Sequence, residues 1–193
     1  MGTEFELKYR AEESCLASIR AAFPGPWAVT AMETTYYDTP GGAISRRRWT
    51  LRHRLEGETR VCTLKTPAPG GARGEWEVTG LGIGQALPEL ARLSGESSLE
   101  TLGEVDLIVA CGARFTRMSR LLELPGCTAE LALDAGSLLG GGRELGFSEV
   151  ELELKSGDSK ALMEYAAGFA PRFGLTTEPL SKFARAKALA QEE

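Results

Sequence analysis

The sequence predicts an α+β fold in which an antiparallel β-barrel with a charged lumen is flanked by helices. Many extended segments follow one another with short turns between them, which indicates an antiparallel sheet and not βαβ units. Each segment alternates charged with apolar residues, so each strand has one charged face and one apolar face. Thr, Ser and Gln are nearly absent from the charged faces, which a closed barrel explains better than a flat solvated sheet.

The order of elements follows from periodicity and from Gly and Pro punctuation. Strands are expected at residues 3–10, 30–38, 49–56, 59–66, 73–79, 105–111, 114–124, 128–135 and 147–155. Helices are expected at about residues 12–23, 85–93, 159–173 and 181–190. Gly57 marks a hairpin turn, and the Pro-Gly-Pro at 24–26 closes the first helix.

A row of carboxylates ending in a lysine occurs near each end of the chain. The first is Glu4, Glu6 and Lys8, and its counterpart is the stretch Glu-Val-Glu-Leu-Glu-Leu-Lys at 149–155. Because residues i, i+2 and i+4 of a strand share one face, the carboxylates of each row lie together. Two such strands in one barrel predict an enclosed acidic cluster that binds hard cations.

The strands between the two acidic rows carry cations on one face. Arg52 and Arg54 share a face, with His53 on the other, and Lys65 lies on the next strand. Arginine and lysine bind phosphate oxygens through charge-assisted hydrogen bonds, and carboxylates hold the Mg²⁺ or Mn²⁺ that bridges to the same phosphates. The lumen therefore suits a polyanion together with divalent ions.

Composition excludes several classes of function. The chain has 193 residues and a net charge of −5, which fits one globular domain and argues against bulk nucleic-acid binding. His53 is the only histidine, so a Ser-His-Asp triad and an HExxH zinc site are excluded. No apolar run is long enough to span a membrane. No cysteine pair has CxxC spacing, which indicates neither a zinc site nor a disulfide framework. We therefore expect a cytoplasmic protein with reduced thiols.

The opening ExExK and eight further ordered blocks, nine in all, resemble the CYTH, or triphosphate tunnel metalloenzyme, superfamily. They are the opening ExExK, Tyr36–Pro40, Leu51–Arg54, Thr63–Lys65, Arg73–Glu75, Thr116–Arg117, Glu130–Asp134, Ser148–Lys155 and Ser181–Arg185. The resemblance implies an eight-stranded antiparallel β tunnel and one CYTH domain over 1–193. The segment 133–157 looks most like the bacterial inorganic triphosphatase branch, which often carries a CHAD domain. The chain is thus either a stand-alone tunnel or an excised domain.

The resemblance also implies the site residues, with Mg²⁺ or Mn²⁺ as cofactor. The catalytic set is Glu4, Glu6, Lys8, Arg52, Arg54, Lys65 and Glu151. The substrate-binding set is Lys8, Arg52, Arg54, Lys65, Arg73, Arg117, Lys182 and Arg185. The metal ligands are Glu4, Glu6, Glu151 and Glu153. The implied reaction is the hydrolysis of inorganic triphosphate to pyrophosphate and phosphate.

Several alternatives remain open at this stage. A nucleoside or thiamine triphosphatase, or a class IV-type adenylate cyclase, would use the same tunnel, and a non-catalytic polyphosphate-binding module would keep only its cations. The full set of carboxylates favours catalysis. Glu130 and Asp134 either orient cations or contact metal, and Lys182 and Arg185 either lie on a solvated helix end or close one mouth of the tunnel. The partner is a small polyphosphate, with no membrane or nucleic acid expected; substrate length, preferred metal and oligomeric state stay open.

Overall fold

The computed structural model describes residues 2–3, 5–67, 73–102 and 106–191, with only the backbone described for Gly2, Thr3 and Arg73. Its strands are β1 (Gly2–Thr3), β2 (Glu6–Arg10), β3 (Ala28–Asp38), β4 (Thr50–Glu56), β5 (Thr59–Pro67), β6 (Arg73–Thr79), β7 (Ile108–Leu124), β8 (Cys127–Gly140), β9 (Arg143–Gly157) and β10 (Thr176–Thr177). Its α-helices are α1 (Glu13–Ala22), α2 (Ala43–Arg46), α3 (Ile83–Ser94), α4 (Ser159–Arg172) and α5 (Lys182–Gln191). The predicted α+β class with an antiparallel sheet is confirmed.

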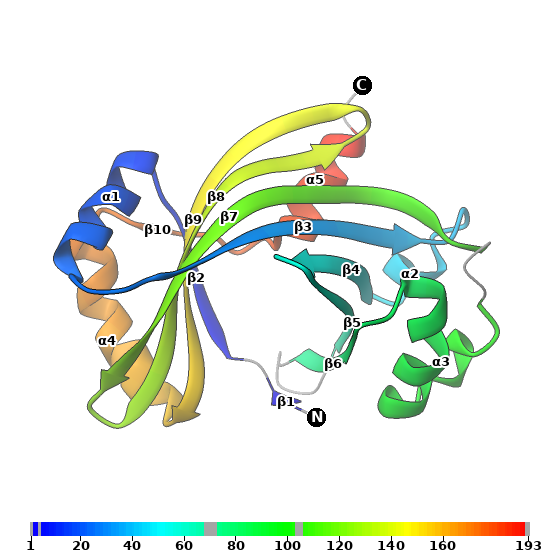
Figure 1. Cartoon of the computed structure of the whole chain (residues 1–193), viewed down its shortest axis with the longest axis horizontal. Helices are drawn as coiled ribbons and strands as arrows, with labels where there is room; N and C mark the ends of the chain where they lie inside the picture. The colour runs from blue at the N-terminus through cyan, green and yellow to red at the C-terminus, as the bar shows by residue number, and fades with distance from the viewer. Residues whose placement is uncertain (1, 4, 68–72, 103–105, 192–193) are drawn as a thin grey trace.

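All strands belong to one antiparallel sheet with the order β1-β6-β5-β4-β3-β7-β8-β9-β2-β10. The N-terminal segment contacts both sides of this order, because β1 pairs with β6 and β2 pairs with β9. When β1 and β2 are counted as one strand and the two-residue β10 as an addition, the ten strands reduce to eight. The sheet therefore curls into a tunnel whose seam is the N-terminal segment (Figure 1).

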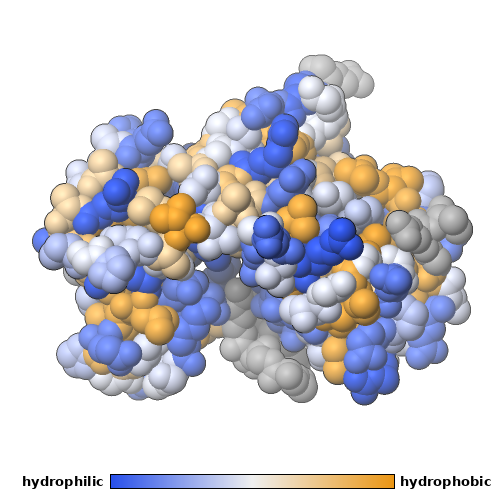
Figure 2. Space-filling view, in the orientation of Figure 1, coloured by the Kyte–Doolittle hydropathy of each residue, from blue (hydrophilic) through white to orange (hydrophobic). Residues whose placement is uncertain are grey.

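Helices cover the sheet at its two ends, with α1 and α4 at one end and α3 at the other (Figure 1), and apolar residues of the strands pack beneath them. Under α1 and α4 lies a core that includes Leu131, Val150 and Leu152, each at most 2% exposed. A second core packs α3 against β4 and β5 and includes Leu51 and Leu64. Burying each of these side chains contributes about 1.5–3 kcal/mol. The outer surface between the two cores shows mixed polar and apolar residues (Figure 2).

Helix α5 differs from the other helices because it packs on residues of the concave side of the sheet. Its Ala186 belongs to a core with Met32, Tyr36 and Phe115, and the ring of Phe183 lies 5.1 Å from that of Tyr36. Glycine allows the close approach, because a Cβ at Gly140 would lie 2.2 Å from the backbone oxygen of Ala186. The C-terminal helix is therefore seated against the inside of the tunnel wall.

The long strands β7, β8 and β9 differ from the sequence prediction. The prediction split residues 105–124 into two strands around Gly112, whereas the structure has one continuous strand, β7. Gly112 does not mark a turn; a Cβ there would lie 2.9 Å from the backbone oxygen of Thr34, so the residue permits close packing of β7 against β3. Similarly, the stretch between 135 and 147 is a hairpin, in which Gly141 and Gly142 take positive φ values of 59° and 75° that suit a two-residue turn.

The short helix α2 was not predicted, and its N-terminus is held by Asp38 at the end of β3. One carboxylate oxygen accepts hydrogen bonds from the backbone N–H groups of Thr39 (2.8 Å) and Ile44 (2.9 Å). Burial by itself would raise the pKa of Asp38, but hydrogen bonds from Ser45, Ile44 and Thr39 outweigh this effect and lower the pKa.

This depressed pKa predicts a pH-dependent contribution of Asp38 to stability. A carboxyl group whose pKa is lower in the folded state stabilises the protein above its unfolded pKa, which is about 3.9, and loses this effect as the pH falls through the folded value. We expect the free energy of unfolding at pH 7 to be about 1 kcal/mol lower for Asp38→Asn than for the wild type, because the amide lacks the charge that the surrounding hydrogen bonds stabilise. The difference should shrink as the pH falls below about 4. Urea titrations at pH 7 and pH 3 that give equal differences would contradict this role.

Candidate active site

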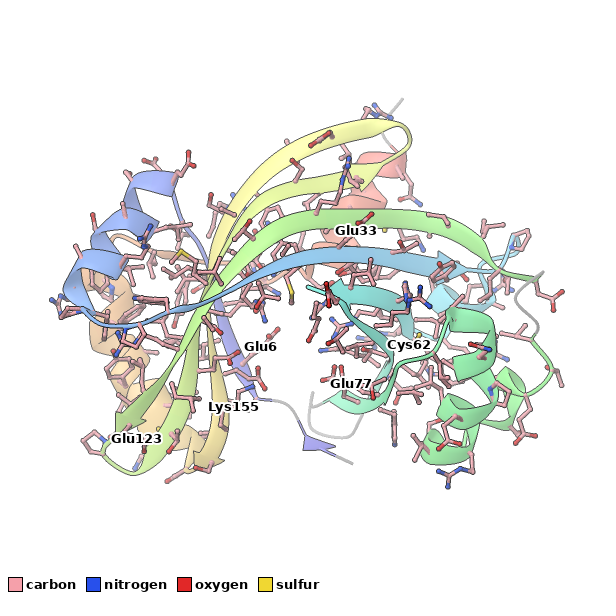
Figure 3. The ribbon with its side chains drawn as sticks, viewed as in Figure 1. Glu6, Glu33, Cys62, Glu77, Glu123 and Lys155 are labelled. Atoms are coloured by element: carbon pink, nitrogen blue, oxygen red, sulfur yellow. The ribbon has the colours of Figure 1, made fainter. Side chains whose placement is uncertain are left out.

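The tunnel encloses a cavity of about 950 Å³ that is lined by side chains of both charges. Figure 3 shows Glu6 and Lys155 on one side of the opening and Glu77 on the other. Glu33, by contrast, is exposed and does not line this cavity. The charged residues that line the cavity are Glu6, Lys8, Arg52, Arg54, Glu56, Lys65, Glu75, Glu77, Arg117, Glu130, Glu151, Glu153, Lys155, Glu178 and Lys182.

One wall of the cavity is formed by cations of β4 and β5. Arg52 lies 3.4 Å from Glu75, and Lys65 lies 3.2 Å from the other oxygen of the same carboxylate. Arg54 donates to the hydroxyl of Thr34 at 3.1 Å. The register explains this grouping, because inward residues of β4 alternate with His53 and Leu51, which face the outer side.

The cations of this cavity are close enough to repel one another. The pKa of Arg54 is lowered first by burial and then by the positive charges of Arg52 and Arg117. Arg52 lies on the same strand, whereas Arg117 lies on β7, so the repulsion acts between different strands of the tunnel. Carboxylates of the same cavity, such as Glu56 beside Arg54 at 3.3 Å, offset part of this repulsion.

Three carboxylates form a row across neighbouring strands. Glu6 of β2 is the register partner of Glu153 of β9, which is in turn the partner of Glu130 of β8. Their side chains are 34%, 28% and 25% exposed, respectively. Lys155 lies 2.9 Å from Glu153 and 3.9 Å from Glu130. We name Glu6, Glu153 and Glu130 the carboxylate row.

A second, buried group of carboxylates consists of Asp134, Glu149 and Glu151, which can bring one oxygen each within 4.8 Å of the others. The ammonium of Lys182 from α5 lies among them, 2.8 Å from Asp134, 2.8 Å from Glu151 and in contact with Glu149. The Arg117 guanidinium donates to both oxygens of Asp134, at 2.8 and 2.7 Å, and contacts Glu151.

Arg185 of α5 contacts Glu149 as well, so three carboxylates face three cations in this buried cluster. Burial opposes ionisation of Glu151, but the attraction of Lys182 and Arg117 outweighs it and holds the pKa of Glu151 well below its usual range. Burial raises the pKa of Glu149 to about 7. Burial also opposes the charge on Lys182, yet Glu151, Asp134 and Glu149 raise its pKa. The side chain of Lys182 therefore stays charged inside the tunnel.

The two groups of carboxylates differ in how well they suit a divalent ion. The buried cluster is already neutralised by cations of the protein, and Lys182 lies where a metal would bind. In the carboxylate row, Glu6 and Glu153 are hard oxygen donors that remain partly open to solvent. Mg²⁺ is usually bound by one or two carboxylates while it keeps several waters. The carboxylate row is therefore the more open of the two groups to an incoming ion, whereas only the buried cluster, among the described residues, brings three carboxylate oxygens within 4.8 Å of one another.

The structure brings most of the predicted site residues into one cavity. Glu4 and the side chain of Arg73 lie outside the described residues. Glu151 lies in the cavity but is held by Lys182 and Arg117, and Arg185 is directed at Glu149 and Glu178. Sequence reasoning missed Glu178, which is contributed by the segment between β10 and α5. No local pattern marks this residue, because its partners Arg10 and Arg185 are distant in sequence.

The family profile of the CYTH domain matches residues 2–185. The chain belongs to the CYTH domain family. Among curated proteins, an inorganic triphosphatase from Haemophilus influenzae is 32% identical to the chain over 133 residues. The match covers 68% of this chain and 38% of that protein, so the chain spans well under half the length of this relative.

Solved structures of other proteins share the CYTH fold. An adenylate cyclase candidate from Bacillus halodurans superposes with a TM-score of 0.67 at 19% identity, over 93% of this chain and 94% of its own. A candidate adenylyl cyclase from Hippeastrum, for which a dominant triphosphatase activity is described, superposes with a TM-score of 0.64 at 19% identity. The match covers 98% of this chain and 97% of that one. A protein from Pyrococcus horikoshii superposes with a TM-score of 0.65 at 21% identity, over 98% of this chain and 99% of its own. These likenesses establish the fold.

Within the part of the chain that the structure describes, no helix combines the length and apolar character needed to cross a membrane.

Proposed function

We propose that the tunnel hydrolyses inorganic triphosphate to pyrophosphate and phosphate with the help of Mg²⁺ or Mn²⁺. The observation that carries this proposal is the convergence of five cations from four strands on one cavity: Lys8, Arg52, Arg54, Lys65 and Arg117. Cations gathered in this way from separate strands favour the binding of a compact polyanion. The likeness to a curated inorganic triphosphatase supports the same reaction.

Cations on different strands would bind and orient the substrate. Lys8, Arg52, Arg54, Lys65 and Arg117 all line the cavity and have side chains at most 16% exposed. Their charges would neutralise the phosphate oxygens and stabilise charge that develops on the leaving pyrophosphate. Their ion pairs with tunnel carboxylates keep them in place before substrate binds, so little reorganisation is needed during the reaction.

The carboxylate row would hold the divalent ion through Glu6 and Glu153, with Glu4 as a further proposed ligand. Glu151, the fourth proposed ligand, would have to exchange its pairing with Lys182 or Arg117 for the ion. When bound, the ion supplies neutralisation of phosphate charge and a lowered pKa for water in its coordination shell. A neighbouring carboxylate would orient the attacking water. No histidine is required for this chemistry, which agrees with the outward position of His53 in β4.

The lining of the cavity also predicts which substrate is preferred. Its charged residues can contact every phosphate of a bare triphosphate, whereas a nucleotide would leave its organic part at a mouth of the tunnel. Those extra atoms would add little binding in the transition state. We expect kcat/KM for triphosphate to exceed that for ATP by at least about tenfold, or about 1.4 kcal/mol.

A phosphate-release assay over triphosphate, ATP, thiamine triphosphate and long-chain polyphosphate, each with Mg²⁺ and with Mn²⁺, measures this preference. Equal kcat/KM for triphosphate and ATP would contradict the assignment. Cyclic AMP as the main product from ATP would indicate a cyclase, and binding of triphosphate without turnover would indicate a polyphosphate-binding module.

A further inference from the structure

Glu178 is a buried carboxylate in the segment that leads from β10 into α5. Its side chain is 1% exposed, although the residue borders the cavity. One oxygen accepts hydrogen bonds from the Nε and Nη2 atoms of Arg10 at 3.2 and 2.8 Å. The other oxygen accepts from the backbone N–H of Leu180 at 3.0 Å. Both oxygens of Glu178 are therefore engaged by donors of the protein itself.

The same carboxylate links two parts of the fold that are far apart in sequence. Arg10 belongs to β2, and the backbone N–H of Glu178 donates to the backbone oxygen of Lys8 on that strand at 2.9 Å. Arg185 belongs to α5 and lies 3.7 Å from Glu178. Arg185 also contacts Glu149, which contacts Lys182. Glu178 therefore joins the wall of the tunnel at β2 to the charged face of α5.

The start of α5 depends on this segment as well. The hydroxyl of Ser181 accepts from the backbone N–H of Ala184 at 3.1 Å and so caps the helix. Lys182, the residue after this cap, enters the buried cluster. The Leu180 hydrogen bond orders the segment locally, and the bonds of Glu178 to Arg10 and to the backbone oxygen of Lys8 attach this segment to β2. A displacement here would move the Lys182 ammonium directly.

We propose that Glu178 is a positioning residue that fixes α5 on β2 and thereby holds the Lys182 ammonium in the tunnel for a phosphate of the substrate. The proposal rests on the proposed function, since it assumes that Lys182 binds the polyphosphate. Glu178 itself contacts neither substrate nor metal. Its burial lowers its tendency to ionise, but hydrogen bonds from Arg10 and Leu180 outweigh this and lower its pKa, so the link stays charged at neutral pH.

A double-mutant cycle tests whether Glu178 acts through Lys182. Affinity for inorganic tripolyphosphate is measured by calorimetry in EDTA for the wild type, Glu178→Gln, Lys182→Met and the double variant. We expect Glu178→Gln to weaken binding about tenfold in the wild-type background and less than about twofold in the Lys182→Met background. Equal weakening in the two backgrounds would overturn the proposal. Glu164→Gln, an exposed change on α4, is the matched control and should leave affinity unchanged.

Amide hydrogen exchange supplies a readout that needs no substrate. In Glu178→Gln, we expect faster exchange in α5 while α4 keeps its wild-type exchange. Unchanged exchange in α5, or equally faster exchange throughout the described fold, would assign Glu178 a general structural role and overturn the proposal. If the wild type binds no tripolyphosphate, the proposed function fails, while the exchange result still decides whether Glu178 fixes α5.

Discussion

Replacing Glu6 by Gln is expected to lower kcat/KM for triphosphate by at least about 100-fold, or about 2.7 kcal/mol, and to leave the fold intact. The amide keeps the size of the side chain but removes the negative charge that a hard cation needs. Glu6 lies at the mouth of the cavity and is partly exposed, so its neutralisation costs little stability. Phosphate release at saturating Mg²⁺ measures the activity, and circular dichroism checks the fold.

The matched control for Glu6→Gln is Glu33→Gln. Glu33 is also a strand glutamate, but it is exposed and lines the shallow outer surface of β3 together with Arg114 (Figure 3). Its neutralisation should leave kcat/KM within about twofold of the wild type. Full activity of Glu6→Gln at saturating Mg²⁺ would remove Glu6 from the proposed metal ligands.

Replacing Asp134 by Asn is expected to destabilise the protein by about 3–5 kcal/mol. Asp134 is fully buried and receives Arg117 in a bidentate pair as well as Lys182. An amide in its place leaves these two buried cations with less compensation and directs an N–H group at one of them. Urea denaturation at pH 7 measures the change, and the melting temperature should fall by about 10 °C.

Glu123→Gln provides the comparison for this loss of stability. Glu123 is exposed at the end of β7, where it accepts one hydrogen bond from the hydroxyl of Thr128 at 2.9 Å. An exposed substitution of this kind should change the free energy of unfolding by less than about 0.5 kcal/mol. If Asp134→Asn were no more destabilising than Glu123→Gln, the buried cluster would not contribute to the stability of the folded tunnel.

Alternation within strands was sufficient to predict which faces of the sheet are charged. The inward side chains of β4 and β5, such as Arg52 and Lys65, line the cavity, whereas Trp76 and Val150 pack into the outer cores. The reason is that the side-chain period of a strand is two, so a single register places a whole set of residues. The order of the elements was likewise predictable, because Gly and Pro mark most of the turns.

Contacts between distant segments could not be predicted in the same way. The sequence shows that Lys182 lies near a helix start, but not that its ammonium enters a cluster with Asp134 and Glu149. The predicted break between residues 111 and 114 was wrong because a glycine at a turn and a glycine at a close approach of two paired strands look the same in one sequence. The contacts of Glu178 with Arg10 on β2 and Arg185 on α5 likewise depend on the tertiary fold.

The central claim is that this tunnel cleaves inorganic triphosphate with a divalent ion, and ³¹P NMR tests it most directly. The purified chain is incubated with triphosphate and Mg²⁺, and in parallel with EDTA, while the phosphorus signals are followed over time. We predict that triphosphate disappears only with Mg²⁺ and gives pyrophosphate and orthophosphate in equal amounts. Triphosphate that persists unchanged with Mg²⁺ and with Mn²⁺ would contradict the account.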